Sequence, residues 1–182
     1  MAVRNKTFIP DRIYFITFTI LKWQKVFMND AYFNMIYKWF DYQIEKYGNK
    51  VHGYVIMPNH FHALIYMSAK SPHISKLVQN AKRFLAYEIV KRLSEDGASD
   101  MTDLFAYKAR RDKGAKHKVF EDSFDAKIIE NANLFIEKLK YIHNNPCKKP
   151  WCLADAPEKY AWSSASNYIL GKGVYDVDVI KL

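Results

Sequence analysis

Residues 54–66 read YVIMPNHFHALIY, an apolar run, a Met57-Pro58-Asn59 turn and a second apolar run that carries two histidines. Apolar runs joined by a short turn predict a β-hairpin. Side chains alternate between the two faces of a strand, so His60 and His62 are expected to share one face. Positions two apart lie about 6.6–6.8 Å from each other along a strand, a span that two imidazoles converging on one divalent cation can bridge. The alternative is that the two histidines share a strand by chance.

The remaining pattern predicts an α+β fold of helices layered on an antiparallel sheet. Residues 12–20 have the alternation of a central strand, and residues 118–129 that of a further strand, with Phe124 on its apolar side. Helices are predicted from Asn29 or Asp30 to Gly48, and over 71–94, which opens with Ser71-Pro72. The polar, acidic stretch 94–103 is predicted to be a mobile loop.

Composition points to a polyanionic partner. The 182 residues include 28 Lys or Arg against 19 Asp or Glu, a net charge of +9, which favours nucleic acid. The longest apolar run, 13–21, falls short of the roughly 20 residues of a membrane span, so we expect no membrane partner. No export signal is evident, which predicts a cytoplasmic protein. Cys147 and Cys152 are expected to be free thiols, because no further Cys or His follows at zinc-finger spacing.

Two segments supply basic side chains that we expect to contact DNA phosphates. One is the polar face of the predicted 71–94 helix, and the other is the basic run 106–118. The candidate residues are Lys76, Lys82, Arg83, Lys108, Arg110, Arg111, Lys113, Lys116 and Lys118.

Residues 141–146, YIHNNP, close a predicted helix that Asn131 or Asn133 caps. Lys138 and Tyr141 lie on one side of this helix at i and i+3. Pro146 ends the helix, because the residue before a proline is pushed out of the α region. Asn145 therefore lies at the helix end, where its side chain is either an ordinary cap or a metal ligand.

The hairpin, YIHNNP and the segment PEKYAWSS at 157–164 together resemble the insertion-sequence type of single-tyrosine HUH transposases, most closely the REP-associated tyrosine transposase branch. The resemblance implies a ferredoxin-like core with the histidine pair on a central strand. It also implies that His60, His62 and Asn145 bind a metal, and that Tyr141 is the nucleophile. Lys138 is a candidate general acid or base. A protein shell this incomplete suits Mg²⁺ or Mn²⁺ shared with substrate and water.

The implied function is cleavage and rejoining of single-stranded DNA, with hairpin recognition, through a phosphotyrosine intermediate. Two alternatives stay open: a replication-initiator or relaxase-like HUH nuclease, and a non-catalytic nucleic-acid-binding domain of ferredoxin-like fold. We expect one domain over residues 1–182, with 171–182 as an edge strand or a flexible tail. A monomer with the tyrosine and histidines from one chain is preferred to a homodimer, because the +9 net charge opposes self-association.

Overall fold

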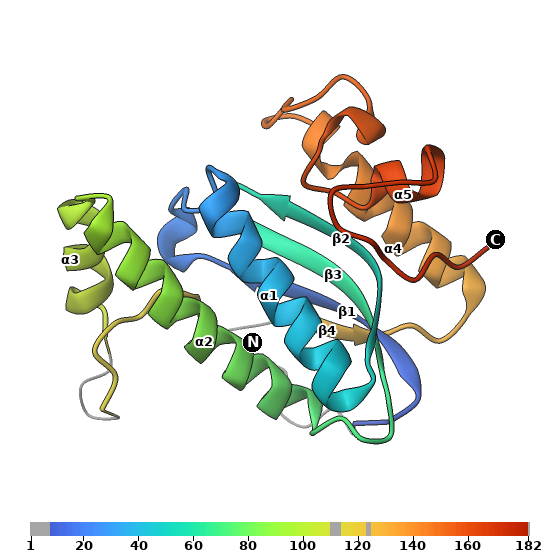
Figure 1. Cartoon of the computed structure of the whole chain (residues 1–182), viewed down its shortest axis with the longest axis horizontal. Coiled ribbons are helices and arrows are strands. Elements are labelled where there is room, and N and C mark those ends of the chain that lie inside the picture. The colour runs from blue at the N-terminus through green and yellow to red at the C-terminus, as the bar shows by residue number, and fades with distance from the viewer. Residues whose placement is uncertain (1–7, 110–113, 123–124, 182) are drawn as a thin grey trace.

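The computed structural model describes residues 8–109, 114–122 and 125–181. A four-stranded antiparallel sheet runs through it in the order β2-β3-β1-β4 (Figure 1). Its strands are β1 (Arg12–Thr19), β2 (Lys50–Met57), β3 (His60–Met67) and β4 (Asp125–Ile128). The predicted α+β fold is therefore confirmed, and the histidine pair lies on the internal strand β3. The strand predicted at 118–129 is shorter than expected, and Phe124 lies outside the described residues.

Helices α1 (Asp30–Tyr47) and α2 (Ile74–Glu95) cover one face of the sheet (Figure 1). Asn29 caps α1 by accepting a hydrogen bond from the Ala31 amide, and Gly48 ends it in the left-handed region at φ 67°. The prediction that Ser71-Pro72 opens α2 is wrong, because the helix begins at Ile74 with His73 as its cap. The His73 ring nitrogen accepts from the Ser75 amide in the place of a serine oxygen.

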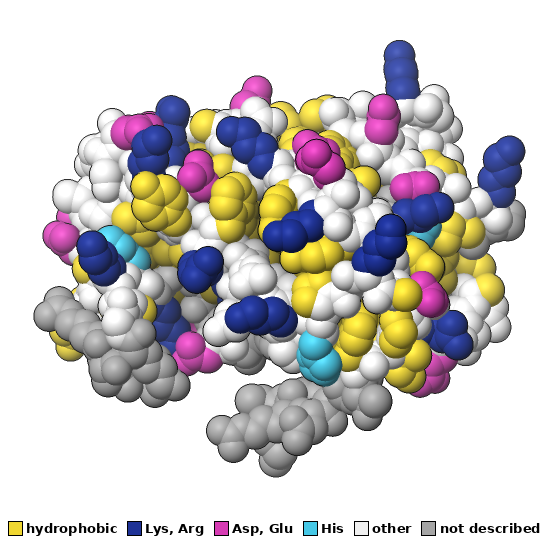
Figure 2. All heavy atoms as spheres, turned by 60° about the horizontal axis from the view of Figure 1, so that its bottom comes forward, with side chains coloured by type: hydrophobic (Ala, Val, Ile, Leu, Met, Phe, Trp, Pro, Cys, Tyr) yellow, Lys and Arg dark blue, Asp and Glu magenta, His cyan; other side chains and the backbone are white. Residues whose placement is uncertain are grey.

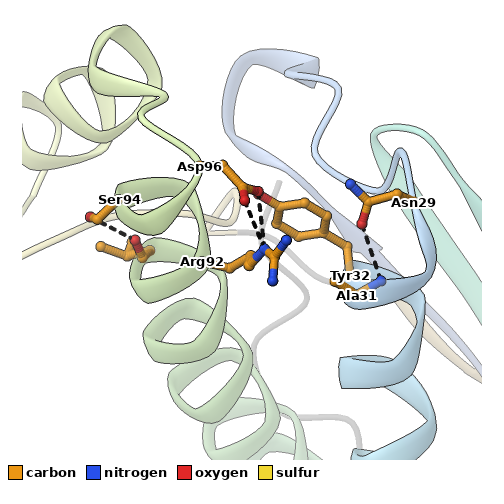
Figure 3. A network of polar contacts seen from close by, with 7 residues as sticks. Asn29, Ala31, Tyr32, Arg92, Ser94 and Asp96 are labelled. Carbon is orange, nitrogen blue, oxygen red and sulfur yellow. Dashed lines mark hydrogen bonds and ion pairs between the residues drawn. The ribbon is translucent and has the colours of Figure 1, made fainter.

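The carboxylate of Asp96 joins the C-terminal end of α2 to the start of α1 (Figure 3). It accepts a hydrogen bond from the Tyr32 hydroxyl at 2.9 Å and pairs with Arg92 Nε at 2.9 Å. The predicted mobile loop at 94–103 is wrong, since helix α3 (Ser99–Tyr107) begins within it. Phe105 is fully buried, and this long-range packing outweighs the local turn preference of the polar residues before it.

The opposite face of the sheet carries α4 (Ala132–Asn144), which Asn131 caps through the Leu134 amide (Figure 1). Its apolar stripe packs in one cluster with Phe15 and Leu64 of the sheet. The buried members of the stripe are the predicted Phe135, Leu139 and Ile142. Short 3₁₀ turns follow at Asn145–Cys147 and Pro157–Lys159, and α5 spans Ala165–Ile169; another 3₁₀ turn, Leu21–Trp23, follows β1.

The C-terminal segment covers the outer edge of β2 without forming a strand. Amide groups of Ser164 and Asp178 donate to the carbonyls of Tyr54 and Val51, and Tyr175 stacks on Tyr37 at 4.8 Å between ring centroids. Residues 171–181 are thus neither an edge strand nor a loose tail, because side-chain packing holds them against β2. No helix within the described ranges is long and apolar enough to cross a membrane.

Candidate active site

His60 and His62 lie on the face of β3 that α4 covers, with their ring centroids 4.8 Å apart. The β1–β3 register sets Thr17 opposite His62 and Thr19 opposite His60. Both imidazoles are buried, with 6% and 5% of their surface exposed. The two rings therefore share one face and lie close enough to approach a common cation.

Asn59 fixes the protonation state of His60 through two hydrogen bonds. The Trp23 carbonyl only accepts, so the Asn59 side-chain nitrogen faces it, at 3.2 Å. The Asn59 side-chain oxygen then faces His60 Nδ1 at 2.7 Å, and because this oxygen also only accepts, Nδ1 carries the proton. The lone pair of His60 is thereby left on Nε2, the form that binds a metal.

His62 Nδ1 contacts the Thr17 hydroxyl at 2.8 Å, and the His62 ring stacks on Phe15 at 5.2 Å between centroids. The Thr17 hydroxyl can donate or accept, so its contact with His62 Nδ1 is compatible with a lone pair on His62 Nε2. This Nε2 is buried and has no hydrogen-bond partner among the described residues. An unpaired buried polar atom costs about 1–3 kcal/mol, so this nitrogen calls for a partner from outside the chain. An uncharged imidazole pair with one orphaned nitrogen fits a divalent cation.

Burial keeps both imidazoles uncharged at neutral pH. It lowers the pKa of His60 to about 4. Burial also lowers the pKa of His62 to about 3, with the neighbouring His60 and the Lys138 ammonium adding to the effect. Since only a neutral imidazole donates a lone pair, both rings are in the ligating state.

Helix α4 brings Tyr141 of the same chain to the histidine pair. Its ring lies 5.2 Å from that of His62 and 6.0 Å from that of Phe15, between centroids. Its side chain is 43% exposed, so a large substrate can reach it. Lys138 Nζ lies 5.9 Å from the Tyr141 ring centroid and 2.9 Å from the Glu137 carboxylate.

Asn145 follows Tyr141 by about one helical turn. It is the C-terminal cap of α4 and keeps helical dihedrals, φ −55° and ψ −47°. The Asn145 Cβ is therefore on the same side of the helix as Tyr141, and its side chain is partly buried. No cluster of three or more His, Cys, Asp or Glu side chains is found in the described part of the chain, so a third ligand there would be an amide, hydroxyl or carbonyl oxygen or a water.

The predicted phosphate-binding residues that the structure describes do not gather around the histidines. Lys76, Lys82 and Arg83 belong to α2, on the other face of the sheet, and Lys108 caps α3. A cleft of about 620 Å³ is lined by Lys82, Arg83, Lys116 and Lys118. Arg110, Arg111 and Lys113 lie outside the described residues.

Two of these lysines already have partners within the chain. Lys82 Nζ donates to the Glu121 carbonyl at 2.5 Å, and burial lowers the pKa of Lys82 to about 8. Lys118 pairs with Asp122 at 2.7 Å. Basic side chains are spread over the face in Figure 2, with acidic ones between them, rather than collected in one patch.

Sequence reasoning missed four residues around the histidines: Thr17, Trp23, Asn59 and Trp151. Trp23 and Trp151 have ring centroids 5.9 and 6.4 Å from that of His60. A threonine inside the apolar run 13–21 and an asparagine next to His60 were the available signals. The tryptophans gave none, because their approach to His60 depends on tertiary structure.

Comparisons with known proteins address the family directly. The family model described as "Transposase IS200 like" matches residues 11–145. The structure of a REP-associated tyrosine transposase bound to a REP hairpin is similar at a TM-score of 0.65 and 14% identity, covering 100% of this chain and 93% of that one. The structure of a Deinococcus radiodurans R1 protein assigned as a transposase is similar at a TM-score of 0.49 and 11% identity, covering 78% of this chain and 95% of that one. No curated protein matches. Since the family model spans well over half of the sequence, the chain belongs to the IS200-like transposase family.

Proposed function

We propose that this chain cleaves and rejoins single-stranded DNA through a covalent bond to Tyr141. The observation that carries the proposal is the Tyr141 ring held 5.2 Å from His62 within one chain, exposed beside two neutral buried imidazoles. Family membership supports strand transfer as the reaction. The REP-associated transposase of similar fold was solved with a hairpin, which supports hairpin-forming DNA as the substrate.

In the proposed reaction the Tyr141 oxygen attacks phosphorus, and the bond from phosphorus to the 3′ oxygen breaks. The products are a 5′-phosphotyrosine and a free 3′-hydroxyl, which reverses the step when it attacks the phosphotyrosine. The ion pair with Glu137 holds Lys138 beside the Tyr141 ring, where its positive charge stabilises a developing phenolate. Lys138 therefore acts as an electrostatic stabiliser in this proposal, since an ammonium cannot accept the phenol proton.

His60 and His62, each through Nε2, would hold a divalent cation, with the Asn145 side-chain oxygen as the third protein ligand. When bound, Mg²⁺ or Mn²⁺ polarises a phosphate oxygen and orients the scissile group. Asn59 and Thr17 keep the two rings in place by contacting their Nδ1 atoms. A relaxase-like nuclease would share this chemistry, but the family match favours a transposase.

Tyr141→Phe is expected to abolish the covalent DNA adduct while DNA affinity stays close to that of the wild type, because only the phenolic oxygen is lost. Denaturing electrophoresis after incubation with hairpin oligonucleotides and Mn²⁺, followed by mass spectrometry, measures the adduct and its position. Tyr87→Phe on α2 is the matched control and should react normally. An adduct of normal yield in the Tyr141 variant would assign the nucleophile elsewhere and leave Tyr141 with a structural role.

His60→Ala and His62→Ala are each expected to weaken Mn²⁺ binding and DNA cleavage together, because each removes one of few protein ligands. A loss of at least 10-fold in metal affinity is about what removing a metal-orienting group costs. Calorimetric titration with Mn²⁺ alone tests this apart from activity. His143→Ala provides a control, since His143 is similarly buried but contacts Ser164, which accepts a hydrogen bond from the Tyr54 amide of β2. Unchanged Mn²⁺ affinity in both site variants would make the pair structural.

The buried histidines also predict that stability falls with acidification. An unfolded imidazole binds a proton near pH 6.5, whereas folded His62 does so only near its pKa of about 3. The contribution of each such histidine to the free energy of unfolding is therefore fully present above pH 6.5. It is lost progressively as the pH falls toward 3, by about 1.4 kcal/mol per pH unit. The free energy of unfolding of His62→Gln is measured with urea at several pH values between 7 and 4.5. Plotted against pH, it should have a slope smaller than that of the wild type by the equivalent of about one bound proton. Equal slopes in variant and wild type would contradict the neutral buried state.

A further inference from the structure

We propose that Trp23 and Trp151 form a base-stacking platform at the mouth of the histidine site, which holds unpaired bases of single-stranded DNA next to the scissile phosphate. The inference deepens the proposed function, because it names what binds the substrate beside Tyr141. It rests on the exposure and position of two indoles that the reaction chemistry does not use.

Trp23 is exposed where burial would be expected of so large an apolar ring. Its side chain is 61% exposed, and its only ring contact among the described residues is with His60, at 5.9 Å between centroids. The backbone is left-handed at both Lys22 and Trp23, with φ 49° and 57°, a conformation that side chains other than glycine rarely adopt. Such conformations persist where the surrounding structure imposes them, and they are concentrated at functional sites.

Two hydrogen bonds hold the backbone of Trp23 in this conformation. The Trp23 amide donates to the Ile20 carbonyl at 2.9 Å, and the Trp23 carbonyl accepts from Asn59 at 3.2 Å. Asn59 also contacts His60 Nδ1, so one amide side chain binds both the backbone that carries Trp23 and the ring of His60. The position of Trp23 is therefore coupled to the site and is not an accident of a surface loop.

Trp151 approaches His60 from the segment after α4, with ring centroids 6.4 Å apart, and is half-buried. The ammonium group of Lys25 lies 6.0 Å from its ring centroid. Lys148 and Lys149, which Pro150 separates from Trp151 in the chain, are exposed, and the Trp151 amide donates to the Lys148 carbonyl. Both indoles thus approach His60, and Trp151 has a cation beside its ring.

Exposed aromatic rings with neighbouring cations suit single-stranded nucleic acid, because every unpaired base has a face to stack and every nucleotide a phosphate to neutralise. A base inside a duplex is already stacked on its neighbours and cannot offer that face. The platform therefore selects an unpaired strand at the site of cleavage and tolerates different bases there. It would leave sequence or hairpin recognition to other surfaces of the molecule.

The test measures binding without metal, in EDTA, so that it is independent of Tyr141 chemistry. A labelled single-stranded oligonucleotide and a duplex of the same length are titrated against wild type, Trp23→Asn, Trp23→Tyr and Trp151→Leu. Asn tolerates the left-handed backbone and removes the ring, while Tyr keeps an aromatic face. Tyr87→Leu, an exposed aromatic on α2 with 70% exposure, is the matched control.

Trp23→Asn and Trp151→Leu are expected to weaken single-strand binding by about 5- to 150-fold, with little change for duplex. Trp23→Tyr and Tyr87→Leu should stay close to wild type, and single-stranded DNA should quench wild-type tryptophan fluorescence. Three results would overturn the platform: unchanged single-strand affinity in both indole variants, equal losses for single strand and duplex, or no preference of the wild type for single strand.

The experiments can reject the platform and the proposed reaction independently of each other. Variants that lack an indole yet bind single strands normally would reject the platform, and a wild-type Tyr141 adduct would still support the reaction. Indole-dependent binding by a wild type that forms no adduct with Mn²⁺ would support the platform and reject the reaction.

Discussion

The docking of α4 on the histidine face of the sheet is the constraint on which the site depends. The helix buries Phe135, Leu139 and Ile142, and its 3.6-residue period then sets Tyr141 at the margin of the buried stripe, half in solvent and in contact with His62. Gly53 of β2 allows this close approach, because a Cβ there would lie 2.8 Å from the Leu139 side chain. One helix–sheet interface thus fixes the distance between the tyrosine and the histidine pair.

The same interface supplies the electrostatics. By excluding water it holds the pKa of His60 and His62 at about 4 and 3 and keeps both rings neutral, at the cost of leaving His62 Nε2 without a partner in the described chain. The polar neighbours Thr17 and Asn59 contact only the Nδ1 atoms, so the Nε2 atoms stay available. A structural histidine pair would be expected to have both ring nitrogens satisfied.

Local sequence signals predicted the parts of the fold that are decided locally. Alternation identified the hairpin, and Asn29, Gly48 and Asn131 marked helix ends that the structure confirms. Contacts between segments distant in the sequence could not be predicted from local signals. Phe105 turns a polar stretch into a helix through burial, and Asn59 reaches a carbonyl 36 positions away. The charge pattern could not show where the basic residues lie: Lys82 and Lys118 have partners within the chain, and α2 lies across the sheet from the histidines. The contact of these basic residues with DNA stays a prediction.

The central claim is that one chain contains a complete active centre, and mixing two inactive variants tests it most directly. In the proposed reaction, His60→Ala lacks a metal ligand and Tyr141→Phe lacks the nucleophile. If the tyrosine acts beside the histidines of its own chain, as the 5.2 Å contact supports, the mixture forms no adduct with hairpin DNA and Mn²⁺ at any protein concentration. Recovery of the adduct in the mixture, under conditions where sedimentation shows a dimer, would mean that the tyrosine acts in the partner's site and would contradict this account.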